Sequence, residues 1–134
     1  MIGIDTNILV RYFLQDDPEQ SKIVTGFFEN KISEENPAFI NIIILCELVW
    51  VLEASYKIQK QKLVELLEKI LITKQFIVQS PDIVWLSLSD YKKNKADFSD
   101  CLIGRINQAQ ECAYTVSFDD SCKKLESFKV LERI

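Results

Sequence analysis

The chain begins Met1-Ile2-Gly3-Ile4-Asp5-Thr6-Asn7-Ile8-Leu9, and this stretch decides the fold class. Residues 1–4 predict a short buried strand that ends at Asp5. The polar group that follows contains Thr6 and Asn7, which are suitable caps for a helix with the apolar positions Ile8, Leu9, Tyr12 and Phe13. A strand that passes at once through polar residues into a helix is the first unit of an alternating α/β pattern.

The same alternation continues to the end of the chain. Further strands are predicted at residues 38–41, 76–79, 113–116 and 129–131. Helices are predicted at residues 18–31, 42–56, 59–72, 81 to the basic run at 92–95, and 99–110 with Ser99 as its cap, and a short one opens at Asp119 or Asp120. Short strands that alternate with helices predict an α/β sandwich with a short central parallel sheet flanked by helices.

Histidine is absent from the sequence, and its absence excludes several enzyme mechanisms. Ser-His-Asp, Cys-His and other histidine-based mechanisms cannot operate, so catalysis would rest on carboxylates, lysines, hydroxyls or a bound metal. The four cysteines have no CxxC spacing, so we expect neither disulfides nor a zinc site. Cys46 and Cys101 lie in apolar helical runs, where a free cysteine acts as a small hydrophobic residue.

The hydropathy pattern indicates a protein without a membrane segment. The longest apolar stretch, residues 42–52, is too short to span a bilayer, and the N-terminus has neither a basic start nor a long apolar segment. We therefore expect no membrane association and a cytoplasmic location. The net charge of −4 argues against a nucleic-acid partner, but carboxylates that bind cations distort this count, so charge alone does not decide the matter.

Glu47 is the only charged side chain among the eleven residues 42–52. The residues one helical turn away on the same face are apolar: Ile43, Ile44, Trp50 and Val51. This pattern predicts a carboxylate on a buried helix face, where burial is costly unless a positive group meets it. A salt bridge to a distant lysine or arginine and a metal site both remain open for Glu47.

Four further acids stand where strands end or helices begin. Asp5 and Asp119 follow predicted strands, and Asp97 and Asp100 flank the start of the last long helix. Capping and helix-dipole compensation explain each of them separately. Sites in α/β folds collect at the carboxyl ends of strands, however, so we expect Asp5 and Asp119 to lie at a site. We also expect open space above Gly104, one turn after Asp100.

Asp5, Glu47, Asp100 and Asp119 are harder to explain as a set than one at a time. Four acids brought to one crevice would repel one another unless cations bound between them. Oxygen ligands suit Mg²⁺ or Mn²⁺ rather than zinc. Such a site can activate water and stabilise the charge of an in-line phosphoryl displacement.

Four blocks of the sequence resemble, in order, the four motif blocks of PIN-domain nucleases. The blocks are Ile4-Asp5-Thr6-Asn7-Ile8-Leu9, Glu47-Leu48-Val49-Trp50-Val51-Leu52, Asp97-Phe98-Ser99-Asp100-Cys101-Leu102-Ile103 and Ser117-Phe118-Asp119. Together they span essentially the whole chain and look most like the VapC-type toxins of bacterial and archaeal toxin–antitoxin pairs. The resemblance implies a PIN-like three-layer sandwich formed by a single domain over residues 1–134.

The resemblance also implies an endoribonuclease that cleaves RNA phosphodiester bonds with a metal-activated water. Mg²⁺ or Mn²⁺ would be held by the catalytic acids, which are Asp5, Glu47, Asp100 and Asp119. Hydrogen bonds from Thr6, Asn7 and Ser117 would support these acids, and Asp97 could join the acidic cluster. A homodimer and a small antitoxin that blocks the active-site groove are implied as well.

Several details depart from the family pattern or stay open. Ser117 stands where the family usually has threonine, and Asp120 competes with Asp119 for the fourth acid, although alignment to the block favours Asp119. The basic residues that could contact RNA phosphates, or only form a solvated surface, are Arg11, Lys57, Lys92, Lys93, Lys95 and Arg105. Trp50 and Trp85 are expected in the core or in a dimer interface.

Other functions fit the sequence less well. A phosphatase of the haloacid-dehalogenase type needs a second aspartate where Asn7 stands. A receiver-type signalling domain needs an acidic pair before the phospho-acceptor, and that pair is absent. The main competing function is a catalytically inactive PIN-fold protein that acts only in binding or regulation.

Overall fold

The computed structural model describes residues 1–132, and it confirms the α/β class. It divides into two compact units, Met1–Gln79 and Ser80–Ile134, and each is described by itself. In the described residues the strand pairs of both units are parallel, as the alternation of strands and helices predicts. The single domain over residues 1–134 stays a prediction.

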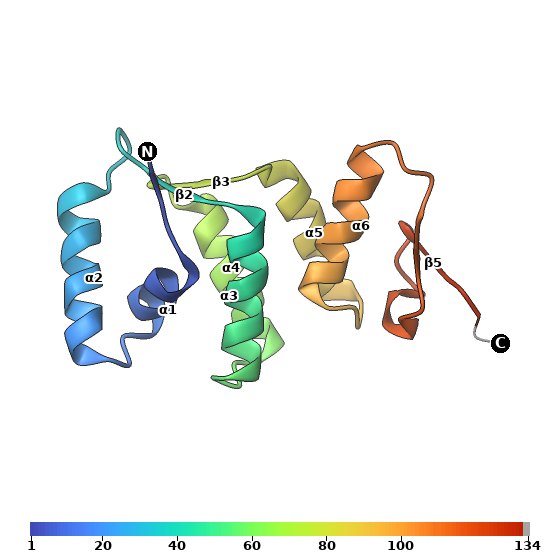
Figure 1. The fold of residues 1–134 in the computed structure, drawn as a ribbon, viewed down its shortest axis with the longest axis horizontal. Coiled ribbons are helices and arrows are strands. Elements are labelled where there is room, and N and C mark those ends of the chain that lie inside the picture. Colours follow the sequence, from blue (N-terminus) through green and yellow to red (C-terminus); the bar gives the residue numbers. More distant parts are fainter. Residues whose placement is uncertain (133–134) are drawn as a thin grey trace. The chain divides into compact units, whose positions relative to one another are not determined.

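The first unit is built around a three-stranded sheet. Its elements in chain order are β1 (Ile2–Gly3), α1 (Thr6–Leu14), α2 (Pro18–Lys31), β2 (Ala38–Ile40), α3 (Ile42–Ala54), α4 (Lys60–Ile72) and β3 (Phe76–Val78). The strand order is β1-β2-β3, and Ala38 at the start of β2 pairs with Ile2 and Phe76. Helix α1 packs against α2 and α3, and α3 packs against α4 (Figure 1).

Apolar periodicity explains why these helices form and what they bury. In α4 the buried positions are Leu63, Val64, Leu67 and Ile70, which recur at the spacing of one helix face. They pack into a core with fully buried residues of β2 and α3, among them Ile40 and Leu48. Full burial of a leucine or isoleucine side chain contributes roughly 1.5–3 kcal/mol.

The second unit joins a helix pair to a small parallel sheet. Its elements are α5 (Pro81–Lys93), α6 (Phe98–Ala109), β4 (Thr115–Ser117), the short 3₁₀ helix η1 (Asp120–Cys122) and β5 (Phe128–Val130). Helices α5 and α6 lie side by side (Figure 1), and the rings of Tyr91 and Phe98 meet edge to face with centroids 5.6 Å apart. Asn107 of α6 donates a hydrogen bond to the Thr115 hydroxyl (2.9 Å), which ties the start of β4 to the helix.

The structure decides between the possible helix caps. Asp5, rather than Thr6 or Asn7, is the N-cap of α1, because its backbone is extended and its carboxylate accepts a hydrogen bond from the Thr6 amide. Asp97, rather than Ser99, is the N-cap of α6, because the Cys101 amide donates to the Asp97 carbonyl (3.1 Å). Ser99 therefore lies inside the first turn of that helix.

One prediction about space is wrong, and one of the two alternatives for the tryptophans is excluded. The side of α6 above Gly104 is filled, because a Cβ atom there would overlap the Ser127 hydroxyl and the Phe128 ring. Neither tryptophan is in the core: Trp50 is 69% exposed and Trp85 is 39% exposed. Their place in a dimer interface stays a prediction.

Helix lengths bear on the predicted absence of a membrane segment. Among residues 1–132, no helix combines the length and the apolar character needed to cross a bilayer.

Candidate active site

The second unit brings two of the predicted acids together. One carboxylate oxygen of Asp100, one of Asp119 and the Cys122 sulfur all lie within 4.8 Å of one another. Asp100 comes from the first turn of α6, and Asp119 from the segment that links β4 to η1. The segment that follows β4 therefore lies beside the start of α6. The predicted location of Asp119 just after a strand is confirmed.

Short hydrogen bonds fix the segment that carries Asp119. The Ser117 hydroxyl accepts a hydrogen bond from the Asp119 amide (2.9 Å), so the last residue of β4 shapes the turn. Oδ1 of Asp119 accepts from both the amide (2.9 Å) and the hydroxyl (2.7 Å) of Ser121, which caps η1. Both of these bonds end on the same carboxylate oxygen. Asp119 can therefore cap η1 through Oδ1 and bind a ligand through its other carboxylate oxygen.

The electrostatics of this pair differ between the two acids. Burial and the negative charges of Asp119 and Asp97 raise the pKa of Asp100, although a hydrogen bond from Cys122 opposes this effect. The hydrogen bonds from Ser121 lower the pKa of the exposed Asp119. Asp97 is exposed, and its effect on Asp100 shows that its charge acts on the same cluster. A cation would relieve the repulsion that the half-buried Asp100 experiences.

The donor set of the second unit fits a divalent cation. Two carboxylates at this separation supply the oxygen ligands that Mg²⁺ and Mn²⁺ prefer. Cys122 adds a sulfur atom at the same place, and Asp120 is not part of the cluster. The sequence reasoning missed Cys122, although its position three residues after Asp119 placed it one turn away along the predicted short helix.

In the first unit, Asp5 lies at the carboxyl end of β1, where a strand-end site was expected. The exposed Asp5 carboxylate uses Oδ1 to accept from the Thr6 amide (2.8 Å). Thr6 is buried, and within residues 1–132 its hydroxyl has no hydrogen-bond partner. Such a group costs about 1–3 kcal/mol, and a bound water or ligand would remove this cost. Asn7 is exposed one residue further along α1.

Glu47 lies on an exposed face of α3, so the prediction of a buried carboxylate is wrong. Its neighbours one turn away, Ile43 and Trp50, are 68% and 69% exposed, while Leu48 and Val49 carry the buried face. Apolar residues therefore lie on both the buried side and the exposed side of α3. Because Glu47 is exposed, the cost of burial gives no reason to expect a metal there. Its carboxylate is accessible to a ligand, and this accessibility still favours a role at a site.

The two arginines named as possible RNA contacts are held inside their units. The Arg11 guanidinium donates to Asp16 (2.8 Å) and to the Tyr56 hydroxyl (3.1 Å), which itself donates to Asp16 (3.0 Å). Arg105 makes a two-point contact with Asp90, at 2.7 and 2.9 Å. The lysines named with them are exposed: Lys57, Lys92, Lys93 and Lys95.

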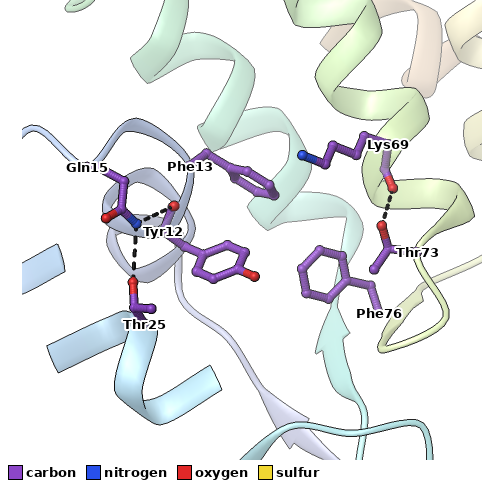
Figure 2. A pocket seen from close by; sticks show the side chains of 7 residues that line it. All are labelled: Tyr12, Phe13, Gln15, Thr25, Lys69, Thr73 and Phe76. Carbon is purple, nitrogen blue, oxygen red and sulfur yellow. Dashed lines mark hydrogen bonds between the residues drawn. The ribbon is translucent and has the colours of Figure 1, made fainter. Parts of the chain in front are cut away.

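A pocket in the first unit lies away from the acids. It has a volume of about 360 Å³, and its lining residues are Tyr12, Phe13, Gln15, Thr25, Lys69, Thr73 and Phe76. Figure 2 shows the rings of Tyr12, Phe13 and Phe76 directed toward its interior, with Lys69 at one side. Asp5 caps the opposite end of α1, about 10 Å along the axis from Tyr12 at 1.5 Å per residue. The pocket contains no carboxylate and is a separate feature.

Comparisons with known proteins identify the family of the chain. The family model for the PIN domain matches residues 2–127. The chain is also similar to a VapC ribonuclease of Aquifex aeolicus (strain VF5), with 29% identity over 122 residues, which cover 91% of this chain and 90% of that protein. Since the family model covers nearly the whole sequence, the chain belongs to the PIN domain family.

Proposed function

We propose that the chain is a divalent-metal-dependent endoribonuclease whose catalytic acids are Asp5, Glu47, Asp100 and Asp119. The observation that carries the proposal is the Asp100–Asp119 pair, because a cation bound between two carboxylates this close would offset the repulsion and burial that raise the pKa of Asp100. Similarity to a protein named VapC ribonuclease supports RNA as the substrate. A divalent cation held by carboxylates can support cleavage of a phosphodiester bond without any histidine.

The protein residues would bind the ion and place the scissile phosphate. Asp100 and Asp119 would hold Mg²⁺ or Mn²⁺, and Ser117 and Ser121 would keep Asp119 in position through the bonds described above. When bound, the ion would supply water activation and neutralise negative charge on the phosphate. Asp97 would strengthen the attraction for a cation by its charge.

The first unit would complete the acidic set. Asp5 and Glu47 are exposed on elements that pack together, because α1 begins at Asp5 and packs against α3. The unpaired hydroxyl of Thr6, next to Asp5, supports a polar ligand or water near this acid. We propose that Asn7 adds a side-chain amide at the same strand end.

We further propose that the protein is the toxin of a toxin–antitoxin pair, acts in the cytoplasm and forms a homodimer. The exposed apolar side chains of Ile43 and Trp50 flank Glu47 on α3. A small antitoxin that covered these side chains would bury large apolar surfaces and hide the carboxylate at the same time. This surface supports an antitoxin that inhibits by covering Glu47.

The second candidate function is a PIN-fold binding protein without catalysis. The exposed apolar surface around Glu47 would serve such a protein equally well. A metal effect on stability separates the two functions, because a cation that binds only the folded state must raise the melting temperature. A binding scaffold predicts no such increase with Mg²⁺ or Mn²⁺.

The direct test is cleavage of total cellular RNA by purified, antitoxin-free protein. We expect discrete fragments with Mg²⁺ or Mn²⁺, and none with a chelator or with the Asp5→Asn variant. Mapping of the fragment ends would identify the target. Folded protein that cleaves nothing under either metal would favour the binding scaffold, and full activity in Asp5→Asn would contradict the assignment of that acid.

A further inference from the structure

Cys122 is the one cysteine that lies against the acidic pair in the described residues. The side chain is fully buried (0% exposed), unlike the exposed Asp119 beside it. Its sulfur lies within 4.8 Å of a carboxylate oxygen of Asp100 and of one of Asp119. It also hydrogen-bonds to the Asp100 carboxylate. A buried thiol with a carboxylate partner does more than fill space.

The short helix η1 holds both acids through two consecutive residues. Ser121 donates a hydrogen bond to Asp119 (2.7 Å), and the next residue, Cys122, bonds to Asp100. Asp100 belongs to α6, so the thiol is a link between that helix and η1. The pair of bonds thus sets how the two carboxylates face each other.

The thiol acts here as a hydrogen-bond donor. A cysteine thiol ordinarily keeps its proton at neutral pH, because its unperturbed pKa is about 8.5. A carboxylate can only accept, so the S–H group donates to Asp100. A donor that bonds to this carboxylate limits the rotation of the Asp100 side chain beside Asp119.

We propose that Cys122 is a positioning residue of the metal site, whose thiol holds the Asp100 carboxylate in the orientation that binds a cation together with Asp119. The inference rests on the proposed function, because it requires a cation at this acidic pair. Partners that orient metal ligands typically change metal affinity by about 10–100-fold when they are removed. A thiol is a weak donor, so the lower end of this range, about 10-fold, is expected.

The test measures Mn²⁺ binding to the full-length, metal-free protein by electron paramagnetic resonance of the free ion. Three variants are compared with the unaltered protein: Cys122→Ala, Cys122→Ser and the control Cys101→Ala. The control removes an equally buried thiol, 1% exposed, from the residue next to Asp100. Circular dichroism confirms that each variant is folded, and Cys122→Val replaces Cys122→Ala if the smaller side chain does not fold.

We expect Cys122→Ala to weaken Mn²⁺ binding about 10-fold, Cys122→Ser to restore most of the affinity through its hydroxyl donor, and Cys101→Ala to leave it unchanged. Unchanged affinity in folded Cys122→Ala, or equal losses in the alanine and serine variants, would overturn the role of Cys122 alone. An equal loss of Mn²⁺ affinity in Cys101→Ala would also overturn this role, because the loss would then come from altered packing and not from the thiol of Cys122. Failure of the unaltered protein to bind Mn²⁺ would overturn the proposed metal site and this inference with it.

Discussion

Replacement of Gly104 by alanine tests how the acidic pair is assembled. Gly104 lies on α6 one turn after Asp100, in contact with the residues at the start of β5. A Cβ atom there would overlap the Ser127 hydroxyl and would lie 2.8 and 3.2 Å from two carbons of the Phe128 ring. Ser127 is buried and Phe128 is half-buried, so neither side chain can simply move into solvent.

Two opposing effects set the size of the change. Alanine is favoured over glycine inside a helix by about 1 kcal/mol. Overpacking of a close contact costs about 1–3 kcal/mol, and overlap with both a hydroxyl and a ring places Gly104→Ala near the upper end. We therefore expect a net loss of about 2 kcal/mol in the free energy of unfolding. A shift of β5 away from α6 should also weaken Mn²⁺ binding, because it moves the segment that carries Asp119.

Urea unfolding followed by circular dichroism measures this loss, with Gly26→Ala as the matched control. Gly26 lies inside α2, and a Cβ atom there would have no neighbour within 4 Å. Only the helix propensity acts at Gly26, so that variant should be stabilised, by up to about 1 kcal/mol. Gly104→Ala that is as stable as the unaltered protein, or more stable, would refute the packing described for α6 and β5.

Three further predictions concern charged groups. Asp100→Asn should raise the melting temperature in chelator at neutral pH, because the pKa of Asp100 is raised and its ionised carboxyl therefore costs stability above that pKa, a cost relieved as the pH falls. The same variant should abolish any increase in melting temperature caused by Mn²⁺, and an unaltered metal effect would exclude Asp100 as a ligand. Arg105→Lys should lose about 1 kcal/mol in urea unfolding, because lysine cannot repeat the two-point contact with Asp90, and full stability would contradict this. The hydrogen bond from Tyr56 and the charge of Arg11 lower the pKa of Asp16 against the effect of burial, so its stabilisation is present above about pH 4 and lost as the pH falls through the lowered value. Asp16→Asn should therefore lose less stability than the unaltered protein in an acid titration below about pH 4, and equal losses would exclude this contribution.

Local signals in the sequence predicted the order and type of the elements. Pro18 at the first turn of α2 and the apolar spacing in α4 act within a few residues, and the structure agrees with them. Ser99 was named as the cap of α6, two residues too late, because Asp97 and Ser99 are both good capping residues. The backbone geometry at Asp97, which the sequence does not contain, decides between them.

Long-range packing accounts for what the sequence could not predict. The apolar run around Glu47 indicated burial, but only the tertiary structure decides which side of an all-apolar helix meets the core. The same holds for Gly104, since the groups that fill its space are more than twenty residues away, at Ser127 and Phe128. Cys122 had no role predicted from the sequence, because its contact with Asp100 depends on how η1 meets α6.

The central claim is that acids of both units act in one metal-dependent nuclease, and the direct measurement is the RNA cleavage rate of single amide variants. Asp5→Asn, Glu47→Gln, Asp100→Asn and Asp119→Asn are compared with Asp120→Asn, which removes a neighbouring exposed acid outside the Asp100–Asp119 cluster. We expect each of the first four variants, while folded, to lose about 100-fold or more in rate with Mg²⁺ or Mn²⁺, as is typical when an active site loses a charge-stabilising group. We expect Asp120→Asn to cleave at a rate near that of the unaltered protein. Substantial cleavage by any of the four, or a loss in Asp120→Asn as large as theirs, would contradict the account.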